Sequence, residues 1–433
     1  MKNNKDKYPS DTFCVFPWIH LHAWPEGKAM LCCKANSGEN GGDVGDFSTN
    51  TYAEIMNSEK MKQIRLDMIE GKEIPQCNAC TNDERLNKNS FRCDMNESYS
   101  DLIPHIISDD YTAADGTLVD PKMYYMDFRF SNLCNLGCQT CGSPLSSTIA
   151  NNREDNTREN IPLMKKGVLS ERGTITSFVY ARPDFFKTDV LPYIDDVRLF
   201  YFAGGEPLMH QEHLDILNYL NENKIYDKHI TYSTNLSLLK WKGTDFLEIW
   251  KNFNSINFFC SIDGDNERLE YIREFSKHVT IFKNLKKLIQ LKKENPSKRL
   301  TVSICYTHSI FNCYYTKEFF KYLVDENIIN DIDHIEFNYS FGDSNSPAIL
   351  PDFAKEELKI KRDEDRNSEE MQIAFRLFPD LKHYFDSIDS ILYENKKSDE
   401  FDRLISNQLM LKIDKIETSL PWLYSVIKRY RVL

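Results

Sequence analysis

The pattern of apolar positions predicts strands that alternate with helices through the middle of the chain. Short apolar runs, several of them aromatic, occur at residues 123–130, 197–203, 229–234, 256–262 and 335–339. The stretches between them are long enough for helices, which is the usual connection between parallel strands. We therefore predict an α/β fold in which residues 121–345 form six strand–helix units around a parallel sheet.

The regions on either side differ in pattern. Residues 1–100 form a cysteine-bearing module with one expected helix at 52–70, and residues 101–120 an Asp-rich linker. Residues 346–433 are charge-dense, with amphipathic patches near 369–378 and 404–416, which predicts a helical C-terminal region. The polar, weakly periodic segment 151–172 is expected to be a long mobile insertion that covers the active cavity.

Three cysteines in the segment after the first expected strand are the most informative feature of the chain. Cys134, Cys138 and Cys141 are separated by three and two residues, and no fourth Cys or His lies between Arg129 and Ser147. Three thiolates can hold one face of an iron–sulfur cluster and leave one iron open, whereas structural zinc prefers four protein ligands. The alternatives are zinc with a distant fourth ligand, or buried cysteines without a metal.

This motif resembles that of the radical S-adenosylmethionine (SAM) enzymes. The resemblance implies a 4Fe-4S cluster whose open iron binds SAM, reductive cleavage of a C–S bond, and a 5′-deoxyadenosyl radical that takes a hydrogen atom from the substrate. It also implies a partial (β/α)6 TIM-like barrel, with the site at the carboxyl ends of the strands. The residue before the third cysteine, usually aromatic and in contact with adenine, is Thr140 here.

The second expected strand ends in Gly204-Gly205-Glu206-Pro207, which resembles the GGEP motif of the same family. Two glycines let the backbone approach a ligand closely, and the neighbouring carboxylate can accept hydrogen bonds from the ammonium group of SAM. Taken alone, the tetrapeptide is equally typical of an ordinary turn. Its position at a strand end, about sixty residues after the cysteines, favours the functional interpretation.

Polar residues also end the next two expected strands. In the family, equivalent positions bind the ribose hydroxyls and the carboxylate of SAM. The resemblance implies these roles for Ser233, Asn235, Ser261, Asp263 and Arg273. The alternative is structural, because Asp-Gly after a strand is a common turn and an Arg on a helix is usually solvated.

A second cysteine group precedes the first. Cys14, Gly27 and Cys32 are followed after a gap by Cys77 and Cys80, a spacing that resembles the auxiliary-cluster part of SPASM and Twitch domains. The resemblance implies that Cys14, Cys32, Cys77 and Cys80 hold a second 4Fe-4S cluster. Few further cysteines follow Cys80, which favours the smaller Twitch type. In familiar members this module follows the barrel, whereas here it precedes it.

Alternatives stay open for this group. A structural zinc site uses the same Cys-x2-Cys half, and His20 and His22 are competing ligands, although both fit a short strand with Ile19 and Leu21. Cys33 can replace Cys32. Three cysteines lie in or just after apolar strand patterns and are expected in the core: Cys260, Cys305 and Cys313.

Composition narrows the class of protein. The chain has 433 residues, of which 41 % are hydrophobic, and this is enough for a large core. Its polar N-terminus and the absence of a long apolar run predict no secretory signal and no membrane span, hence a cytoplasmic protein. Twelve cysteines in a cytoplasmic protein favour metal binding over disulfides. The net charge of −12 argues against nucleic-acid partners.

The resemblance thus implies a radical SAM oxidoreductase or mutase of the Twitch/SPASM group, reduced by an external donor such as flavodoxin or ferredoxin. It favours a residue of a ribosomally made peptide as substrate, with a small carbohydrate or nucleotide-derived metabolite as the alternative. Aromatic residues near 200–202 and 337–339 are expected to line the substrate cavity. The competing class is an interaction protein that zinc stabilises through both cysteine groups.

Overall fold

The computed structural model describes residues 7–35, 42–86, 88–151, 182–339, 345–382, 385, 399–406 and 412–432. The expected insertion at 151–172 lies outside these residues apart from its first position. Among the described residues, no helix is long and apolar enough to cross a membrane.

A nine-stranded sheet, in the order β11-β10-β9-β6-β5-β4-β1-β2-β3, organises the chain. Six of its strands are parallel neighbours in chain order: β4 (Tyr125–Phe128), β5 (Leu199–Phe202), β6 (His229–Thr234), β9 (Ser255–Ser261), β10 (Arg299–His308) and β11 (His334–Tyr339). The predicted α/β class with a large parallel sheet is confirmed. The strand positions agree with the apolar runs, and β10, between the last two of them, brings the parallel strands to the predicted six.

The N-terminal module continues this sheet. Its strand β1 (His20–Ala23) pairs in parallel with β4, in a register that places His22 opposite Asp127. Two short antiparallel strands, β2 (Lys28–Met30) and β3 (Gly45–Asp46), follow at the edge. His20 and His22 therefore lie on a strand as predicted, and a single hydrophobic core extends from Phe13 to Ile427.

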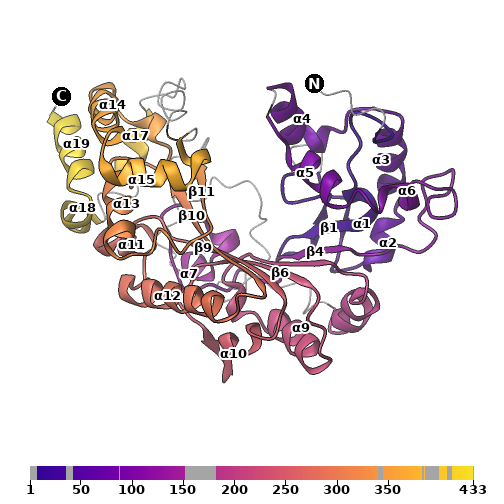
Figure 1. Ribbon diagram of the computed structural model, residues 1–433. Coiled ribbons are helices and arrows are strands. Elements are labelled where there is room, and N and C mark those ends of the chain that lie inside the picture. Colours follow the sequence, from indigo (N-terminus) through magenta and orange to yellow (C-terminus); the bar gives the residue numbers. More distant parts are fainter. Residues whose placement is uncertain are drawn as a thin grey trace.

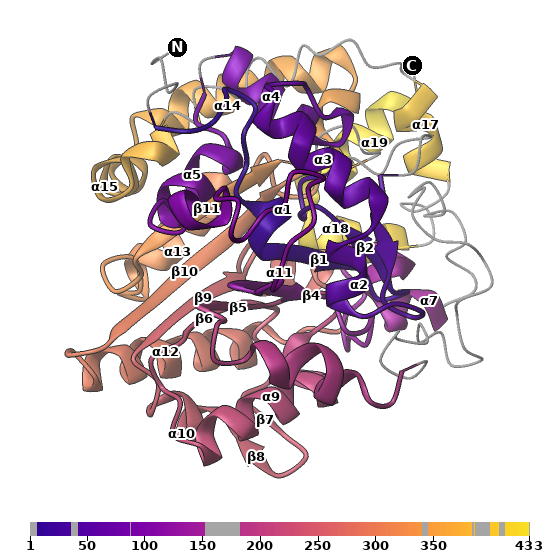
Figure 2. The ribbon, with the colours of Figure 1, turned by 90° about the vertical axis from the view of Figure 1, so that its right-hand side faces the viewer.

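The two faces of the sheet differ in character. Along β9 buried and half-buried residues alternate, with Ile256, Phe258 and Cys260 on the buried face. Helices α9 (Gln211–Glu222), α10 (Phe246–Trp250) and α12 (His278–Glu294) cover that face (Figures 1 and 2). Trp250 of α10, for example, packs edge-on against Phe258 with ring centroids 4.8 Å apart. The opposite face carries polar, half-exposed side chains.

The expected helix at 52–70 consists of two helices, α2 (Tyr52–Met56) and α3 (Glu59–Ile69). The break follows from capping chemistry, since the Ser58 side chain accepts a hydrogen bond from the Met61 N–H and so begins a new helix. Ile55, Met56, Met61, Ile64 and Met68 are buried, as the periodicity predicts. The expected linker contains the short helix α6 (Ile103–Ile106).

The remaining elements connect or flank the sheet. In the N-terminal module they are α1 (Phe16–Ile19), η2 (Pro75–Cys77), α4 (Asn78–Arg85) and α5 (Phe91–Ser98). Between the strands lie η3 (Ser143–Leu145), α7 (Ser147–Asn151), η5 (Phe186–Val190), η6 (Leu191–Tyr193), η7 (Pro207–Met209), the hairpin β7 (Lys240–Trp241) and β8 (Thr244–Asp245), α11 (Asn266–Ile272) and α13 (Thr316–Asp325). After β11 come η8 (Pro347–Ile349), α14 (Asp352–Arg366), α15 (Glu369–Leu377), α17 (Asp399–Leu404), α18 (Ile413–Ser419) and α19 (Pro421–Val432). Figure 1 shows the N-terminal module and these last helices at opposite ends of the sheet.

Candidate functional site

The three-cysteine loop follows the carboxyl end of β4 and is fixed at both ends by hydrogen bonds. The Cys134 N–H donates to Ser147 Oγ at 3.1 Å, and Thr148 Oγ1 donates to the Cys134 carbonyl at 2.7 Å. On the other side, the Gly137 N–H donates to the Glu274 carbonyl just after α11 at 3.0 Å, and the Gln139 N–H donates to the Ile272 carbonyl at the end of α11 at 2.7 Å. Cys134, Cys138 and Cys141 thereby gather in one small cluster with Leu136, separate from the main core.

Two side chains, one after a strand and one after a helix, reach the sulfur atoms of this loop. Asn235, which follows β6, points its Nδ2 at Cys134 Sγ at 3.8 Å. Arg273, which follows α11, points a guanidinium nitrogen at Cys138 Sγ at 3.8 Å. N–H donors and a cation beside thiolates stabilise their negative charge. The resemblance predicts SAM contacts for both residues, and the structure places both beside the cysteines instead of leaving them solvated.

The Gly204-Gly205 pair lies against the same loop. Gly205 has φ +55°, and a Cβ there would come within 2.4 Å of the Leu133 carbonyl oxygen. A Cβ on Gly204, at φ +82°, would meet the Arg129 side chain at 3.0 Å. Glycine at these two positions therefore allows a close approach to the cysteine loop, and the predicted approach of this backbone to a ligand stays a prediction.

Glu206 is fully buried, and both its carboxylate oxygens have partners within the protein. Oε1 accepts from Thr234 Oγ1 at 2.8 Å and from the Leu208 N–H at 3.2 Å, and Oε2 accepts from the Asn235 N–H at 2.8 Å. Glu206 thus joins the end of β5 to the end of β6 and fixes the backbone that carries Asn235. Its predicted contact with the ammonium group of SAM stays a prediction.

The other residues expected at the SAM site lie at adjacent strand ends. Ser233 shares a hydrogen bond of 2.7 Å with the Tyr201 hydroxyl on the polar face of the sheet. Asp263 is buried and paired with Arg273 at 2.8 Å, while its other oxygen accepts from the Thr307 N–H. Ser261 ends β9, and Thr140 is half-buried in the cysteine loop. The parallel sheet thus brings together residues that are far apart in sequence.

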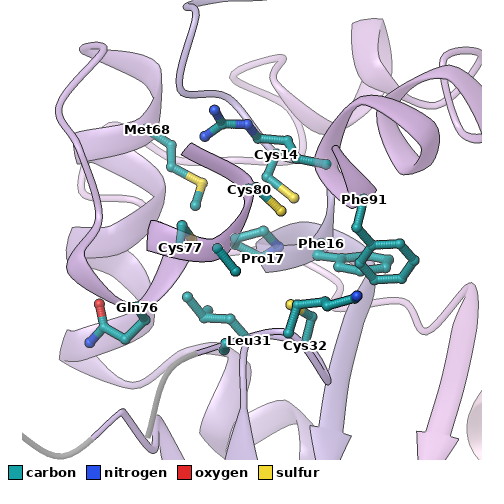
Figure 3. A pocket seen from close by; sticks show the side chains of 14 residues that line it. Cys14, Phe16, Pro17, Leu31, Cys32, Met68, Gln76, Cys77, Cys80 and Phe91 are labelled. Atoms are coloured by element: carbon teal, nitrogen blue, oxygen red, sulfur yellow. The ribbon is translucent and has the colours of Figure 1, made fainter. Parts of the chain in front are cut away.

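The second cysteine group lines a cavity in the N-terminal module (Figure 3). Cys14 precedes α1, Cys32 follows β2, Cys77 ends η2 and Cys80 lies in α4 directly after η2, so three separate segments supply the four thiols. The sulfur atoms of Cys14 and Cys80 point toward one another in the cavity (Figure 3). The remaining lining is largely apolar: Phe16, Pro17, Leu31, Met68 and Phe91 among others.

The competing ligands lie elsewhere. Cys33 does not line the cavity and is influenced by the charges of Asp127 and Arg129, so the structure separates it from its neighbour Cys32. His20 and His22 lie in β1 and are not among the cavity residues. Cys260 and Cys313 are buried in the core as predicted.

Cys305 departs from the prediction that it is a core residue. It is half-buried on the polar face, where its thiol donates to Glu336 on β11 at 3.6 Å. The reason is its position in β10, since Ile304 and Tyr306 on either side take the buried face.

Arg92 is a functional candidate that the sequence pattern missed. It lines the same cavity, is buried, and donates from its Nε to Glu84 at 3.0 Å and from another guanidinium nitrogen to the Thr12 carbonyl at 3.2 Å. Its charge acts on the thiols of Cys14 and Cys80. A buried cation among cysteines suits a negatively charged group, but a lone Arg on a helix carries no distinctive signal in the sequence.

The donor sets fit iron–sulfur clusters. Burial raises the pKa of the Cys134 thiol to about 12 and that of Cys77 to about 11, so a bound metal has to stabilise the thiolate forms. Each group has basic or N–H donors directed at sulfur atoms, which such clusters require. Within the described ranges, no three His, Cys, Asp or Glu side chains are placed to hold a single metal ion.

The aromatic residues expected around the substrate are mostly in the core. Phe200, Phe202 and Phe337 are buried on the helix-covered face, because alternation along a strand sends neighbouring side chains to opposite faces. Phe202, for instance, packs against His213 of α9. Only Tyr201 of the first run faces the polar side, where it contacts Ser233.

A family model described as the SPASM iron–sulfur cluster-binding domain matches residues 14–81. This range begins at Cys14 and ends one residue after Cys80, so it contains all four thiols of the cavity. No curated protein sequence matches the chain.

Several solved structures resemble the chain remotely. They include anSMEcpe with bound AdoMet and a Cp18Cys peptide (17 % identity, 54 % of this chain and 57 % of that one, TM-score 0.30). Another is Streptococcus suis SuiB bound to the precursor peptide SuiA (15 % identity, 79 % of this chain and 67 % of that one, TM-score 0.31). A third is TYW1 with a lysine-pyruvate adduct bound (12 % identity, 57 % of this chain and 72 % of that one, TM-score 0.27). The chain thus spans less than two thirds of the length of anSMEcpe, and likenesses this weak support no inference about function.

Two observations point to iron–sulfur chemistry in this chain. Residues 14–81 match an iron–sulfur domain, and the three-cysteine and Gly-Gly-Glu-Pro motifs meet at adjacent carboxyl ends of parallel strands. Residues 14–81 thus match an iron–sulfur cluster-binding domain, and the four thiols of the cavity are the candidate cluster ligands within it.

Proposed function

We propose that the chain is a radical SAM enzyme that modifies a residue of a ribosomally made peptide, as an oxidoreductase or a mutase. The observation that carries the radical SAM part is the three-thiol loop at the end of β4, with Asn235 and Arg273 directed at its sulfur atoms. This loop contains three thiols and no fourth cysteine, which suits a cluster with one open iron.

In this proposal Cys134, Cys138 and Cys141 hold the SAM cluster. When bound, the reduced cluster and SAM supply a 5′-deoxyadenosyl radical that takes a hydrogen atom from the substrate. Asn235 and Arg273 stabilise the thiolates, while Asp263 keeps the Arg273 guanidinium in place through their buried 2.8 Å ion pair. Gly205 lets the loops approach, and Glu206 fixes the Asn235 backbone. Thr140, Gly204, Ser233 and Ser261 complete the proposed SAM site.

Cys14, Cys32, Cys77 and Cys80 hold the auxiliary cluster in the cavity of the N-terminal module. Arg92 compensates part of the negative charge there. We further propose a domain organisation of residues 1–100 for the module, 121–345 for a partial (β/α)6 barrel and 346–433 for a helical region. An external flavodoxin or ferredoxin is the proposed reductant.

A peptide is preferred over a small carbohydrate or nucleotide-derived metabolite because the polar face of the sheet stays half-exposed along β5, β6 and β9. A small ligand usually occupies an enclosed pocket that buries most of its surface. The net charge of −12 is unfavourable for a nucleic-acid substrate.

The test is hydrogen transfer. Reduced, cluster-loaded protein with SAM is incubated with deuterated peptides encoded beside the gene and, separately, with a deuterated cellular fraction below about 1 kDa, the size range of small ligands. Deuterium in 5′-deoxyadenosine from the peptide supports the proposal, and deuterium only from the small fraction replaces the peptide with a metabolite. Stoichiometric zinc with negligible iron after anaerobic reconstitution would instead support the zinc-stabilised interaction protein.

A further inference from the structure

A buried polar cluster lies on the sheet where the N-terminal module joins the barrel strands. His22 of β1 and Asp127 of β4 are register partners, and His22 Nδ1 lies 3.0 Å from Asp127 Oδ2. Arg129, two residues after Asp127, contacts the other carboxylate oxygen through its Nε at 2.9 Å. The Arg129 guanidinium also lies over the Tyr201 ring, 4.9 Å from its centroid. The cluster thus joins three neighbouring strands on one face.

The protonation of the cluster follows from these contacts. Burial opposes ionisation of Asp127, but the Arg129 guanidinium and the hydrogen bond from His22 hold its pKa below the usual range. An ionised carboxylate only accepts hydrogen bonds, so His22 has to carry a proton on Nδ1. In the neutral imidazole, Nε2 then has a free lone pair and is an acceptor.

Nothing in the described structure satisfies that acceptor. His22 is 1 % exposed, and its Nε2 is buried without a hydrogen-bond partner among the residues that the structure describes. A buried polar atom without a partner is destabilising, because it loses its hydrogen bonds to water and gains none in return. His20, two residues earlier on the same face, differs in that its Nδ1 forms a hydrogen bond with the Tyr125 carbonyl, 2.9 Å away, and contacts no carboxylate.

The cluster lies between the two cysteine groups. Arg129 is five residues before Cys134, at the start of the loop that carries the three thiols. On its other side, Cys33 is close enough for the charges of Asp127 and Arg129 to act on its thiol, and Cys32 next to it lines the auxiliary cavity. A substrate on the polar face that reaches the three-cysteine loop would therefore pass this cluster.

We propose that His22, oriented by Asp127, is a substrate-binding residue whose Nε2 accepts a hydrogen bond from an N–H or O–H group of the substrate. The group is an amide or hydroxyl in a peptide substrate. Asp127 is a positioning residue, and Arg129 keeps it ionised. This inference rests on the proposed function, because it takes the polar face to be the substrate side of a radical SAM site.

The informative variant is His22→Asn, whose amide can still donate to Asp127 from the Nδ1 position but has no atom at the Nε2 position. His20→Asn is the matched control on the same strand and face. Both are compared with wild type for iron content, for SAM cleavage without substrate, and for deuterium transfer from the substrate that wild type uses.

We expect His22→Asn to keep its iron and its substrate-free SAM cleavage, while KM for the substrate rises about tenfold or more, the worth of one lost hydrogen bond to a buried partner. His20→Asn should keep the wild-type KM. Asp127→Asn should raise KM as well, because an amide in place of the carboxylate can turn the imidazole to its other tautomer.

Equal KM values for wild type and His22→Asn would overturn the inference and mean that the Nε2 atom is satisfied by water. Wild-type protein that makes no 5′-deoxyadenosine would refute the proposed function, and this inference with it. The first failure appears only in the variant and the second in the wild type, so the two are distinguishable.

Discussion

The two cysteine sites of this chain are built in opposite ways. The three thiols after β4 come from one eight-residue loop, and the rest of the site reaches them from other strand ends through Asn235 and Arg273. The four thiols of the N-terminal cavity come from three segments and are enclosed by apolar side chains and Arg92. In the proposed function, the first arrangement leaves one iron of its cluster open for a ligand, whereas the second supplies all four protein ligands of its cluster. A chain can thus separate the site of chemistry from a site that only needs to hold a cluster.

The largest expected effect comes from removing one ligand of each site. Anaerobically reconstituted wild type should hold about eight irons in two 4Fe-4S clusters. Cys138→Ala and Cys77→Ala should each lose about half of them, and only Cys138→Ala should abolish 5′-deoxyadenosine formation, since the open site alone binds SAM. Iron analysis and product chromatography measure both. Loss of all iron in Cys77→Ala would mean that the two sites do not load independently.

The next prediction tests how closely the loops approach at the open site. Gly205→Ala places a Cβ 2.4 Å from the Leu133 carbonyl oxygen, whereas Gly243, also at positive φ, has nothing within 4 Å of the position that a Cβ would take. Both substitutions cost about 1–2 kcal/mol of backbone strain. Gly205→Ala should cost at least about 2 kcal/mol more, because the backbone has to move.

Denaturant unfolding compares the two glycine variants, and SAM cleavage is assayed in parallel. Gly205→Ala should lose SAM cleavage but keep the auxiliary cluster, while Gly243→Ala keeps both. Equal stability of the two variants would show that the Gly205 loop can yield and that close approach is not required there.

A smaller expected effect is a pH dependence of the stability of the folded chain, caused by the buried Glu206 next to the three-cysteine loop. Burial raises the pKa of Glu206 to about 7 from an ordinary 4.5, although three hydrogen-bond donors oppose the shift. Between about pH 4.5 and pH 7, the Glu206 carboxyl is therefore ionised in the unfolded chain and protonated in the folded chain. The stability that Glu206 contributes is fully present below pH 4.5 and is lost as the pH rises to about 7, by up to about 3 kcal/mol.

The measurement is the difference in Tm between wild type and Glu206→Gln across about pH 5 to 8, which should decline with rising pH. Glu357→Gln is the control. The hydrogen bonds from Arg429 lower the pKa of Glu357, so its titration falls below this window. A flat difference for Glu206 would mean that the carboxylate is ionised throughout and that its three donors outweigh burial.

The smallest expected effect is on the midpoint potential of the cluster proposed for the four-cysteine cavity. Arg92→Gln removes a buried cation beside the Cys14 and Cys80 thiols, which should lower the midpoint potential of the auxiliary cluster. Glu84→Gln removes the anion that binds Arg92 and should raise the potential. Each shift corresponds to at most about 2 kcal/mol for charges roughly 8 Å apart at an effective dielectric constant of about 20.

Spectroscopic redox titration measures these potentials, in a background with Cys138→Ala so that only one cluster contributes. Shifts of opposite sign identify an electrostatic role for the pair. Shifts in the same direction would point to altered packing of the cavity instead.

The two cysteine sites also differ in how much of each can be predicted from the sequence. The three-cysteine site lies in a local motif, so its spacing can be read from the sequence, and the strands before it and after it are visible as short apolar, aromatic-rich runs. Family resemblance predicts the donors Asn235 and Arg273 at the site, but their direction toward sulfur depends on how loops from three strands pack.

The surroundings of the four-cysteine cavity and the order of the strands in the sheet are harder to predict. Cysteine spacing indicates the four thiols, but Arg92 and Glu84 reach this region from helices with no distinctive pattern. The pairing of β1 with β4 joins residues about a hundred positions apart, and no local signal encodes such a contact. A charged residue in an apolar strand, Asp127, is the one available hint of the polar cluster.

The placement of β1 has a consequence for how the chain stays soluble while it folds. β4 pairs with β5 on one side and with β1 on the other. Without the N-terminal module, β4 would become an edge strand with a row of unpaired N–H and C=O groups, which is a template for association with other chains. The cluster-binding module therefore also protects an edge, and cutting it away would leave the remaining sheet prone to aggregate.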